Sequence, residues 1–275
     1  MQLTLLGTGC PSVDYKRCGS ANLVSTKNTR ILVDCGSGVT QRLNQAKISS
    51  ADIDALFFTH LHSDHVVDFY QLIISSWHSY RTKPWKIYGP KGTKKFIKNI
   101  MAAWAKERKQ RILYESRASI KAFDVKVTEF GSTGNYSFKD LKIKYFEVDH
   151  KPVKYAYGFS FFNKSKKLTI SGDTRPCENL MKFAHNSDVL LHEVFIEGEI
   201  KETNKMRTKK TLHNVQRYHT SSSQVGKVAF ITRSKKLVLT HFVPTRFNVS
   251  RLKKIVRKDF GKDPVIGNDL LKISI

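Results

Sequence analysis

The sequence has little cysteine and no long apolar run. Its 275 residues include four cysteines, Cys10, Cys18, Cys35 and Cys177, with no C-x-x-C pair among them. Cysteines this sparse exclude a disulfide framework and fit the reducing cytoplasm. No stretch of about 18 apolar residues occurs, so we expect no transmembrane helix and no membrane partner. The first residues, Met1–Gly7, lack a basic leader and predict a β-strand rather than a signal peptide.

Internal repeats, low-complexity tracts and Pro/Gly/Ser-rich linkers are also absent. The simplest organisation is one domain over residues 1–275, which is long enough to bury a substantial core. Continuous apolar runs, typical of strands covered on both faces, alternate with helical segments. The expected strands are Gln2–Leu6, Ala21–Ser25, Arg30–Asp34, Ala55–Thr59, Trp85–Tyr88, Val125–Glu129, Leu141–Val148, Tyr157–Phe162, Lys167–Ser171, Val189–Glu193 and Lys236–Thr240. The expected helices are Val39–Gln45, Asp68–His78, Thr93–Lys109, Pro176–Ala184, Ser222–Ile231 and Val249–Phe260. This mixture predicts an α/β (α+β) fold with helices packed outside the sheets.

Acidic residues are scarce relative to basic ones. The chain has 48 Lys and Arg against 23 Asp and Glu, a net charge of +25. A field of this sign attracts polyanions and speeds encounters with them. The lysines are spread along the chain, so a compositional bias without a binding role is the alternative. Two segments, Lys91–Arg111 and Lys201–Arg217, are especially basic, and each is either a grip for a phosphate backbone or a solvated helix face.

The densest motif reads HLHSDH at residues 60–65, directly after the apolar run Ala55–Phe58. It places three histidines and one carboxylate within six residues. The end of a strand presents the first side chains and the turn into the next helix presents the others, so the four groups can converge. Imidazole and carboxylate together suit zinc, and also iron or manganese. A polar, histidine-rich loop is the alternative, and the density of possible ligands argues against it.

Three further strand-like runs end in a histidine or an aspartate. His150 follows Val148-Asp149, Asp173 lies in Ser171–Thr174, and His241 follows the run that ends at Thr240. Each of these residues alone would be an ordinary turn residue or structural histidine. Because buried strands deliver the residues at their ends to a common rim, the three together with the 60–65 motif predict a metal centre.

The order of these residues resembles the metallo-β-lactamase superfamily, and the finer match is to its ribonuclease Z and arylsulfatase-like branch. The superfamily pattern is carried by His60, His62, Asp64, His65, His150, Asp173 and His241. The branch motifs are LGTGCP at 6–11, VDCGSG at 33–38, YGPKG at 88–92, LHE at 191–193 and YHTS at 218–221. The matches cover nearly the whole chain, and the resemblance implies a four-layer αββα sandwich.

The resemblance implies two divalent metal ions, zinc first, with manganese or iron as alternatives. One ion would be bound by His60, His62 and His150, the other by Asp64, His65 and His241, with Asp173 as the bridge. Two ions about 4 Å apart lower the pKa of a shared water and hold a hydroxide as the nucleophile at neutral pH. Asp64 would also orient that water or accept its proton.

A histidine and a glutamate complete the implied site. In this branch the histidine of the His-Thr motif lies near the leaving group, with the glutamate of the His-Glu motif behind it. The matching residues are His219 and Glu193. A carboxylate fixes the tautomer of an imidazole and raises its pKa, which equips the ring to protonate an alkoxide. The alternative is a structural histidine before the next helix. We expect Asp34, at the end of another strand, to support the site by hydrogen bonding without binding metal.

Two departures from the ribonuclease Z pattern bear on the substrate. Long-arm ribonuclease Z enzymes carry a protruding arm for transfer RNA between the third histidine and the bridging aspartate, whereas only Lys151–Gly172 separates these positions here. The residues Val66-Val67-Asp68, which follow the 60–65 motif, also resemble the arylsulfatase-like group.

We therefore expect a metal-dependent hydrolase of ester bonds. The first interpretation of this chain is a phosphodiesterase that resembles ribonuclease Z, which is an RNA endonuclease of the transfer RNA 3′-processing type. Its substrate would be anionic. One alternative is an arylsulfatase-like or small phosphate-ester hydrolase. Another is a nucleic-acid-binding protein with a vestigial metal site, although unused buried histidines and carboxylates would be costly to keep. Relatives in this branch are often dimers, so a homodimer also stays open.

Overall fold

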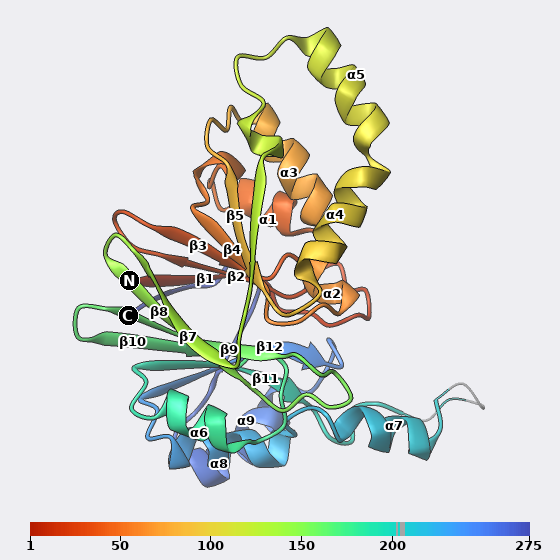
Figure 1. The fold of residues 1–275 in the computed structure, drawn as a ribbon. Coiled ribbons are helices and arrows are strands. Elements are labelled where there is room, and N and C mark those ends of the chain that lie inside the picture. The colour runs from red at the N-terminus through yellow and green to blue at the C-terminus, as the bar shows by residue number, and fades with distance from the viewer. Residues whose placement is uncertain (202, 204–206) are drawn as a thin grey trace.

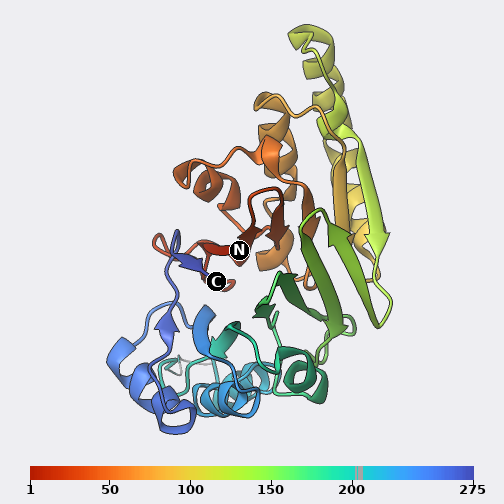
Figure 2. The ribbon, with the colours of Figure 1, turned by 90° about the vertical axis from the view of Figure 1, so that its left-hand side faces the viewer.

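Two seven-stranded sheets face each other in the computed structural model, which describes residues 1–201, 203 and 207–275 (Figures 1 and 2). In spatial order, the first sheet contains β14 (Lys272–Ser274), β1 (Gln2–Gly7), β2 (Ala21–Ser25), β3 (Arg30–Val33), β4 (Ala55–Phe57), β5 (Trp85–Gly89) and β6 (Val125–Glu129). The second sheet contains β13 (Val265–Ile266), β12 (Lys236–Val243), β11 (Val189–Phe195), β10 (Lys166–Ile170), β9 (Tyr157–Asn163), β8 (Leu141–Glu147) and β7 (Thr133–Phe138).

Helices cover the outer face of each sheet. The helices are α1 (Val39–Gln45), α2 (Ser63–Val66), α3 (Phe69–His78), α4 (Thr93–Ala103), α5 (Ala105–Glu115), α6 (Glu178–Ala184), α7 (Lys209–Gln216), α8 (Ser222–Ile231) and α9 (Val249–Phe260), with short 3-10 turns at Ser50–Asp52 and Lys121–Phe123. Helices α1, α3 and α4 pack on the first sheet, and α6, α8 and α9 pack on the second. The predicted αββα sandwich is confirmed. None of the helices in the described ranges is long and apolar enough to span a membrane.

The strands are apolar at consecutive positions because both of their faces are covered. In β3, Ile31 and Val33 pack in the core between the sheets, whereas Leu32 packs under the outer helices. In and just after β4, Phe57 faces the inner core and Phe58 the outer one. Side chains alternate between the two faces of a strand, so each continuous run divides into two half-sets that fill separate cores.

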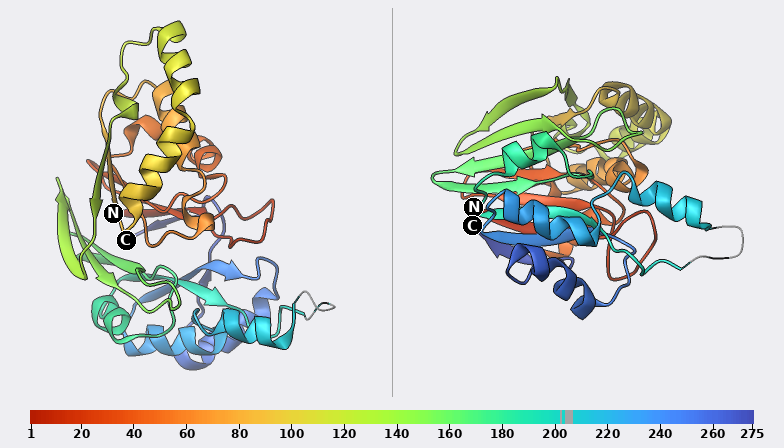
Figure 3. Two further views of the ribbon diagram at one scale, coloured as in Figure 1. Left: turned by 45° about the vertical axis from the view of Figure 1, so that its right-hand side comes forward. Right: turned by 90° about the horizontal axis from the view of Figure 1, so that it is seen from below.

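Several elements differ from the sequence expectation. The helix expected over Thr93–Lys109 is interrupted at Trp104, where α4 ends and α5 begins. Strands β7, β13 and β14 and helix α7 were not expected. Strand β7 reads TGNYSF and is half exposed, and α7 buries no residue, so neither has the apolar pattern that marks a covered element. Helix α7 stands away from the body of the molecule (Figure 3).

The two sheets bring parallel strand ends to one edge of the sandwich. Strands β3, β4 and β5 run parallel in the first sheet, as do β10, β11 and β12 in the second. The segments that follow β4, β8 and β10 and the last residues of β12 carry the histidines and aspartates selected from the sequence. This edge is therefore where a functional centre would form.

Candidate metal centre

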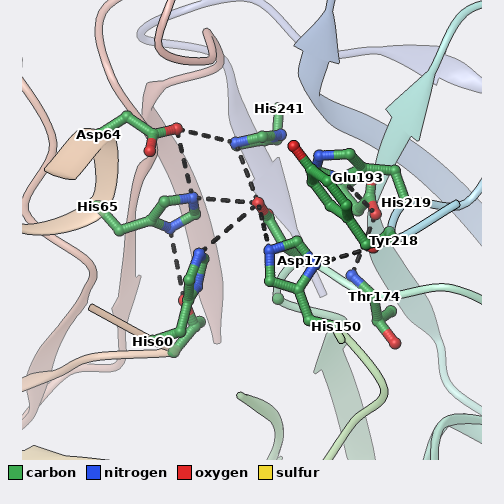
Figure 4. Close-up of polar contacts among 12 residues, drawn as sticks. His60, Asp64, His65, His150, Asp173, Thr174, Glu193, Tyr218, His219 and His241 are labelled. Carbon is green, nitrogen blue, oxygen red and sulfur yellow. Dashed lines mark hydrogen bonds and ion pairs between the residues drawn. The ribbon is translucent and has the colours of Figure 1, made fainter. Parts of the chain in front are cut away.

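All seven side chains predicted as metal ligands meet at this edge. His60 and His62 lie in the segment between β4 and α2, and Asp64 and His65 lie in α2. The other three come from the second half of the chain, after β8 (His150), after β10 (Asp173) and within β12 (His241). Figure 4 shows the Asp173 carboxylate in the middle of a ring of imidazoles.

One carboxylate oxygen of Asp173 lies close to four histidine nitrogens. Its Oδ2 is 3.3 Å from His241 Nε2, 3.4 Å from His65 Nε2, 3.8 Å from His60 Nε2 and 3.9 Å from His150 Nε2. The Asp173 side chain is only 3% exposed. A shared oxygen among four imidazoles has the position that a bridging ligand needs.

Two groups of donor atoms contain the seven predicted ligands. Within each group, the donor atoms all lie within 4.8 Å of one another. One group is His60, His62, His150 and Asp173, and the other is Asp64, His65 and His241. In the second group, Asp64 Oδ2 lies 3.1 Å from His241 Nε2 and 3.6 Å from His65 Nε2. These groups coincide with the two ligand sets that the resemblance implies.

The imidazole nitrogens that face the centre are unsatisfied. Within the described part of the chain, the buried Nε2 atoms of His60, His65 and His150 have no hydrogen-bond partner. A buried polar atom without a partner costs about 1–3 kcal/mol, so such atoms call for an explanation. Three unsatisfied nitrogens converging on carboxylates fit divalent metal ions, since imidazole and carboxylate are the ligands that such ions take.

Hydrogen bonds on the far side of the rings aim these nitrogens. His60 Nδ1 lies 3.0 Å from Thr59 Oγ1, and His150 Nδ1 lies 2.8 Å from the carbonyl oxygen of Tyr218. A proton on Nδ1 leaves Nε2 with a free lone pair, so each bond fixes the tautomer that binds metal.

Asp34 does the same for His65, as the sequence predicts. Its Oδ2 accepts from His65 Nδ1 at 2.8 Å, and its carboxylate also accepts from the backbone N–H and the hydroxyl of Thr59. The side chain of Asp34 is buried and does not reach the centre itself. It therefore orients a predicted ligand and belongs to neither donor group itself.

Replacing Asp34 by asparagine should weaken metal binding. Loss of such an orienting carboxylate typically lowers metal affinity 10- to 100-fold, and we expect a fall of that size in a competition titration with a chelator. Asp68→Asn is the control, because Asp68 accepts from the backbone N–H and hydroxyl of Thr40 and bonds no proposed ligand. Equal losses of affinity in both variants would contradict an orienting role for Asp34.

Charge and burial shape the protonation of the centre. Burial lowers the pKa of His60 and of His150, which keeps these imidazoles in the neutral form that binds metal. Burial alone would also lower the pKa of His65, but nearby carboxylates, Asp173 foremost, raise it well above its usual value. In the second group the carboxylates therefore stabilise positive charge, which a bound cation would also supply.

His219 and Glu193 form the predicted pair beside the ligands. His219 Nδ1 donates to Glu193 Oε1 at 3.1 Å, and the same oxygen accepts from the backbone N–H groups of Thr174 and Thr220. Burial opposes protonation of His219, yet the Glu193 carboxylate raises the pKa of the ring above its usual value. His219 is almost fully buried, with its ring beside that of His150. The carboxylate therefore favours the protonated form of a ring at the edge of the donor cluster.

A cavity of about 470 Å³ opens over the centre. Asp64, Asp173, His219 and His241 lie on one side of it, and Cys10, Pro11 and Ser12 form part of its rim. Apolar side chains also line the cavity and form what we call its apolar wall, together with Arg207 and Thr211; they are Ile200, Leu212, Val215, Val243 and Pro244.

Sequence reasoning missed that wall and the role of Tyr218. Tyr218 also lines the cavity, and its ring centroid lies 4.6 Å from that of His219. The one available signal for the wall was the pair Leu212 and Val215, spaced three residues apart in an otherwise polar segment.

Comparisons with known proteins agree with this architecture. The model of a family described as Anti-Pycsar protein Apyc1 matches residues 1–222. The ribonuclease Z of Mycolicibacterium gilvum (strain PYR-GCK) is 31% identical, over 100% of this chain and 96% of that protein. Among solved structures, the metallo-β-lactamase fold protein YhfI from Bacillus subtilis matches with a TM-score of 0.77 and 19% identity, over 99% of this chain and 98% of that one. The short form of human tRNase Z matches with a TM-score of 0.74 and 23% identity, over 100% and 99%.

The fold and the site together define the class of protein, a metal-dependent hydrolase of ester bonds with the metallo-β-lactamase fold. Its cluster of histidines and aspartates binds divalent metal. The predicted resemblance to ribonuclease Z is confirmed by a relative that spans the whole chain. The chain belongs to the family described as Anti-Pycsar protein Apyc1, and it is a ribonuclease Z-like enzyme.

Proposed function

We propose that this protein is a two-metal, zinc-dependent phosphodiesterase of the ribonuclease Z type that cleaves RNA. His60, His62 and His150 would hold one ion, and Asp64, His65 and His241 the other, with Asp173 shared. The observation that carries the proposal is this convergence of seven donor side chains beside the paired His219 and Glu193. Two such ions supply a water of lowered pKa and neutralise charge on the oxygens of the attacked phosphorus.

The residues of the chain would have separate tasks in the reaction. Asp64, which bonds His241 and lines the cavity, would orient the attacking water or accept its proton. His219, whose Nδ1–H donates to Glu193, would give the proton on its Nε2 to the leaving oxygen. The buried setting of both groups limits competing water and strengthens their electrostatic effect.

RNA is supported by charge and by the curated relatives. The net charge is +25, Arg207 lines the cavity, and Lys209 and Lys210 are exposed on the adjoining helix α7. Lys94 and Lys95 are exposed at the start of α4, whose N-cap residue Gly92 lies against Leu61 of the 60–65 motif. Basic groups in a cavity lining and on the helices around it can grip the backbone of a strand that passes over the metal centre. The relatives that match over the full chain are named ribonuclease Z.

The reaction class can be tested with two chromogenic esters. We expect the zinc- or manganese-loaded protein to hydrolyse bis(p-nitrophenyl) phosphate and to leave p-nitrophenyl sulfate intact. Hydrolysis of the sulfate alone would favour the arylsulfatase-like interpretation. Metal-loaded protein that binds RNA but turns over neither ester nor RNA would favour the vestigial-site interpretation.

The RNA substrate needs its own assay. Cleavage of a precursor transfer RNA near its 3′ end should have a KM that rises steeply with salt, because binding to phosphates releases counterions. A KM that ignores salt, or phosphodiester turnover without RNA cleavage, would reject RNA and leave the phosphodiesterase assignment in place.

A small phosphodiester with a single nucleoside is the second candidate, and the apolar wall of the cavity favours it. Leu212 and Val215 are half buried on the face of α7 that lines the cavity, and Ile200 and Pro244 adjoin them. A cavity of about 470 Å³ with a charged floor and an apolar wall suits one phosphate and one flat ring.

Replacing Leu212 by asparagine tests this wall. Methyl p-nitrophenyl phosphate and thymidine 5′-(p-nitrophenyl) phosphate share a leaving group and differ only in the nucleoside. We expect the variant to raise KM about tenfold for the thymidine ester alone, since an apolar contact of about 1–2 kcal/mol is lost. His213→Asn, on the exposed side of the same helix, should change neither value. Equal KM values for both esters in the unmodified protein would reject a nucleoside-binding wall.

A further inference from the structure

His241 is held differently from the other buried histidines of the centre. His60, His65 and His150 each have an Nδ1 hydrogen bond, whereas His241 Nδ1 has no partner among the described residues. The backbone of His241 also has a φ of 44°, in the left-handed region that residues other than glycine seldom adopt. The side-chain hydrogen bond of His241, from Nε2 to Asp64 Oδ2 at 3.1 Å, joins two proposed ligands to each other and does not anchor the ring to the scaffold. The backbone preference of the residue does not explain its position either.

A β-bulge places His241. Along the pairing of β11 and β12, Glu193 is opposite Thr240 and the next residue, Val194, is opposite Phe242. His241 is therefore the extra residue of the bulge, a device that turns a side chain toward a site. Directly after it, the Phe242 N–H donates to the carbonyl oxygen of Thr8 at 3.1 Å. The Thr8 carbonyl thus anchors the chain on one side of the strained residue.

Thr8 is itself held by a buried carboxylate. Its backbone N–H and its hydroxyl both donate to Asp269 Oδ1, at 3.0 and 2.8 Å. Asp269 Oδ2 accepts from the Cys18 N–H at 2.8 Å and from Arg42 Nε at 2.9 Å. The side chain of Asp269 is only 4% exposed. Four donors from three separate segments therefore converge on one carboxylate near the C-terminus of the chain.

Arg17 packs beside the hydrogen bond between Phe242 and Thr8. Its Nη1 donates to Thr8 Oγ1 and to the carbonyl oxygen of Gly267, both at 2.7 Å, and its guanidinium lies 4.4 Å from the centre of the Phe242 ring. Arg17 thus contacts both residues that form the hydrogen bond beside His241.

We propose that Thr8, Arg17 and Asp269 form a clamp that positions His241 for metal binding, which makes Asp269 a positioning residue of the second ligand group. The clamp replaces the Nδ1 hydrogen bond that the other three histidines have. It acts through the backbone, from Asp269 to Thr8 and from Thr8 to Phe242. Two readouts test this inference. One of them, the affinity for zinc, rests on the proposed metal assignment, and the other, the exchange of a backbone amide, does not depend on that assignment.

The metal-independent readout is the exchange of the Phe242 amide hydrogen in metal-free protein, measured by NMR. Asp269→Asn puts an amide NH₂ group where the carboxylate accepts from Cys18 and Arg42. We expect the Phe242 amide to exchange at least about tenfold faster in this variant. Thr8→Val, which removes only the hydroxyl, should act in the same direction, and Thr8→Ser should keep the slow exchange.

The second readout is a zinc titration against a chelator. In Asp269→Asn and Thr8→Val, one of the two equivalents of zinc should lose about 10- to 100-fold in affinity, the usual effect of a lost supporting contact, while the other equivalent stays within twofold. If the unmodified protein binds only one equivalent, the two-metal proposal fails, and amide exchange alone decides the clamp.

Asp188→Asn is the matched control. Asp188 has a side chain 12% exposed and accepts from a backbone N–H of Lys167 and from Lys235 Nζ, both at 2.8 Å, at the start of β11 and away from the ligands. This control should lose stability without changing the exchange of Phe242 or the affinity for zinc. Unchanged exchange of Phe242 in both Asp269→Asn and Thr8→Val, or the same change in Asp188→Asn, would overturn the clamp.

Discussion

Asp173→Asn is expected to lower turnover of bis(p-nitrophenyl) phosphate about 1,000-fold or more and to bring the metal content below two per chain. The reason is geometric, because Asp173 Oδ2 lies between 3.3 and 3.9 Å from four histidine nitrogens that belong to both ligand groups. An amide keeps the volume of the side chain but loses the negative charge that two adjacent cations require. Metal content by elemental analysis after gel filtration and kcat by absorbance are the measurements.

The matched control for this prediction is Asp149→Asn. Asp149 is the neighbour of His150 in the sequence, but its carboxylate is 26% exposed and pairs with Arg175 at 2.7 Å instead of facing the centre. Metal content and kcat should both stay within twofold of the unmodified protein. If Asp173→Asn retains two metal ions and more than a tenth of the activity, Asp173 is not the shared ligand.

His219→Ala should have an effect that depends on the leaving group. A proton donor contributes about 10²- to 10⁴-fold when the leaving oxygen is a strong base. We therefore expect a loss in that range for a dinucleotide, whose leaving group is an alkoxide, and a much smaller loss for bis(p-nitrophenyl) phosphate, whose leaving group departs as a stable anion. Glu193→Gln should act in the same direction, because it removes the charge that raises the pKa of His219.

Metal content separates this role from metal ligation. Donor atoms of His219, Asp173 and His241 lie within 4.8 Å of one another, so His219 is close enough to be an additional ligand. Unchanged metal content in His219→Ala supports the proton donor, whereas lost metal, or equal losses on both substrates, contradicts it. His213→Ala is the control, since His213 is exposed on α7 and outside the ring of ligands.

Much of the candidate site was predictable because its residues lie in recognisable local sequence patterns. HLHSDH is too dense in ligands for an ordinary loop, and His150, Asp173 and His241 each follow a strand-like apolar run, so that together with this motif they predict one centre. Helix α8 was predictable at its start for a similar reason, since Ser221 and Gln224 form a capping box there. By contrast, β7 and α7 are polar and half exposed. Their structure depends on the elements that pack beside them, so the apolar pattern of the sequence does not predict them.

The sequence by itself predicted the set of proposed metal ligands from the density of the 60–65 motif and the residues at strand ends. Through the family motifs it also predicted the four-layer sandwich and the pairing of His219 with Glu193, because such motifs are local properties. Only the tertiary structure decided which groups aim those ligands. Thr8 meets Asp269 across 261 positions of the chain, and His150 meets the carbonyl of Tyr218 across 68. Such contacts depend on how the two sheets close on each other. A backbone carbonyl oxygen or a β-bulge is not specified by any one residue type, so the sequence does not predict its role.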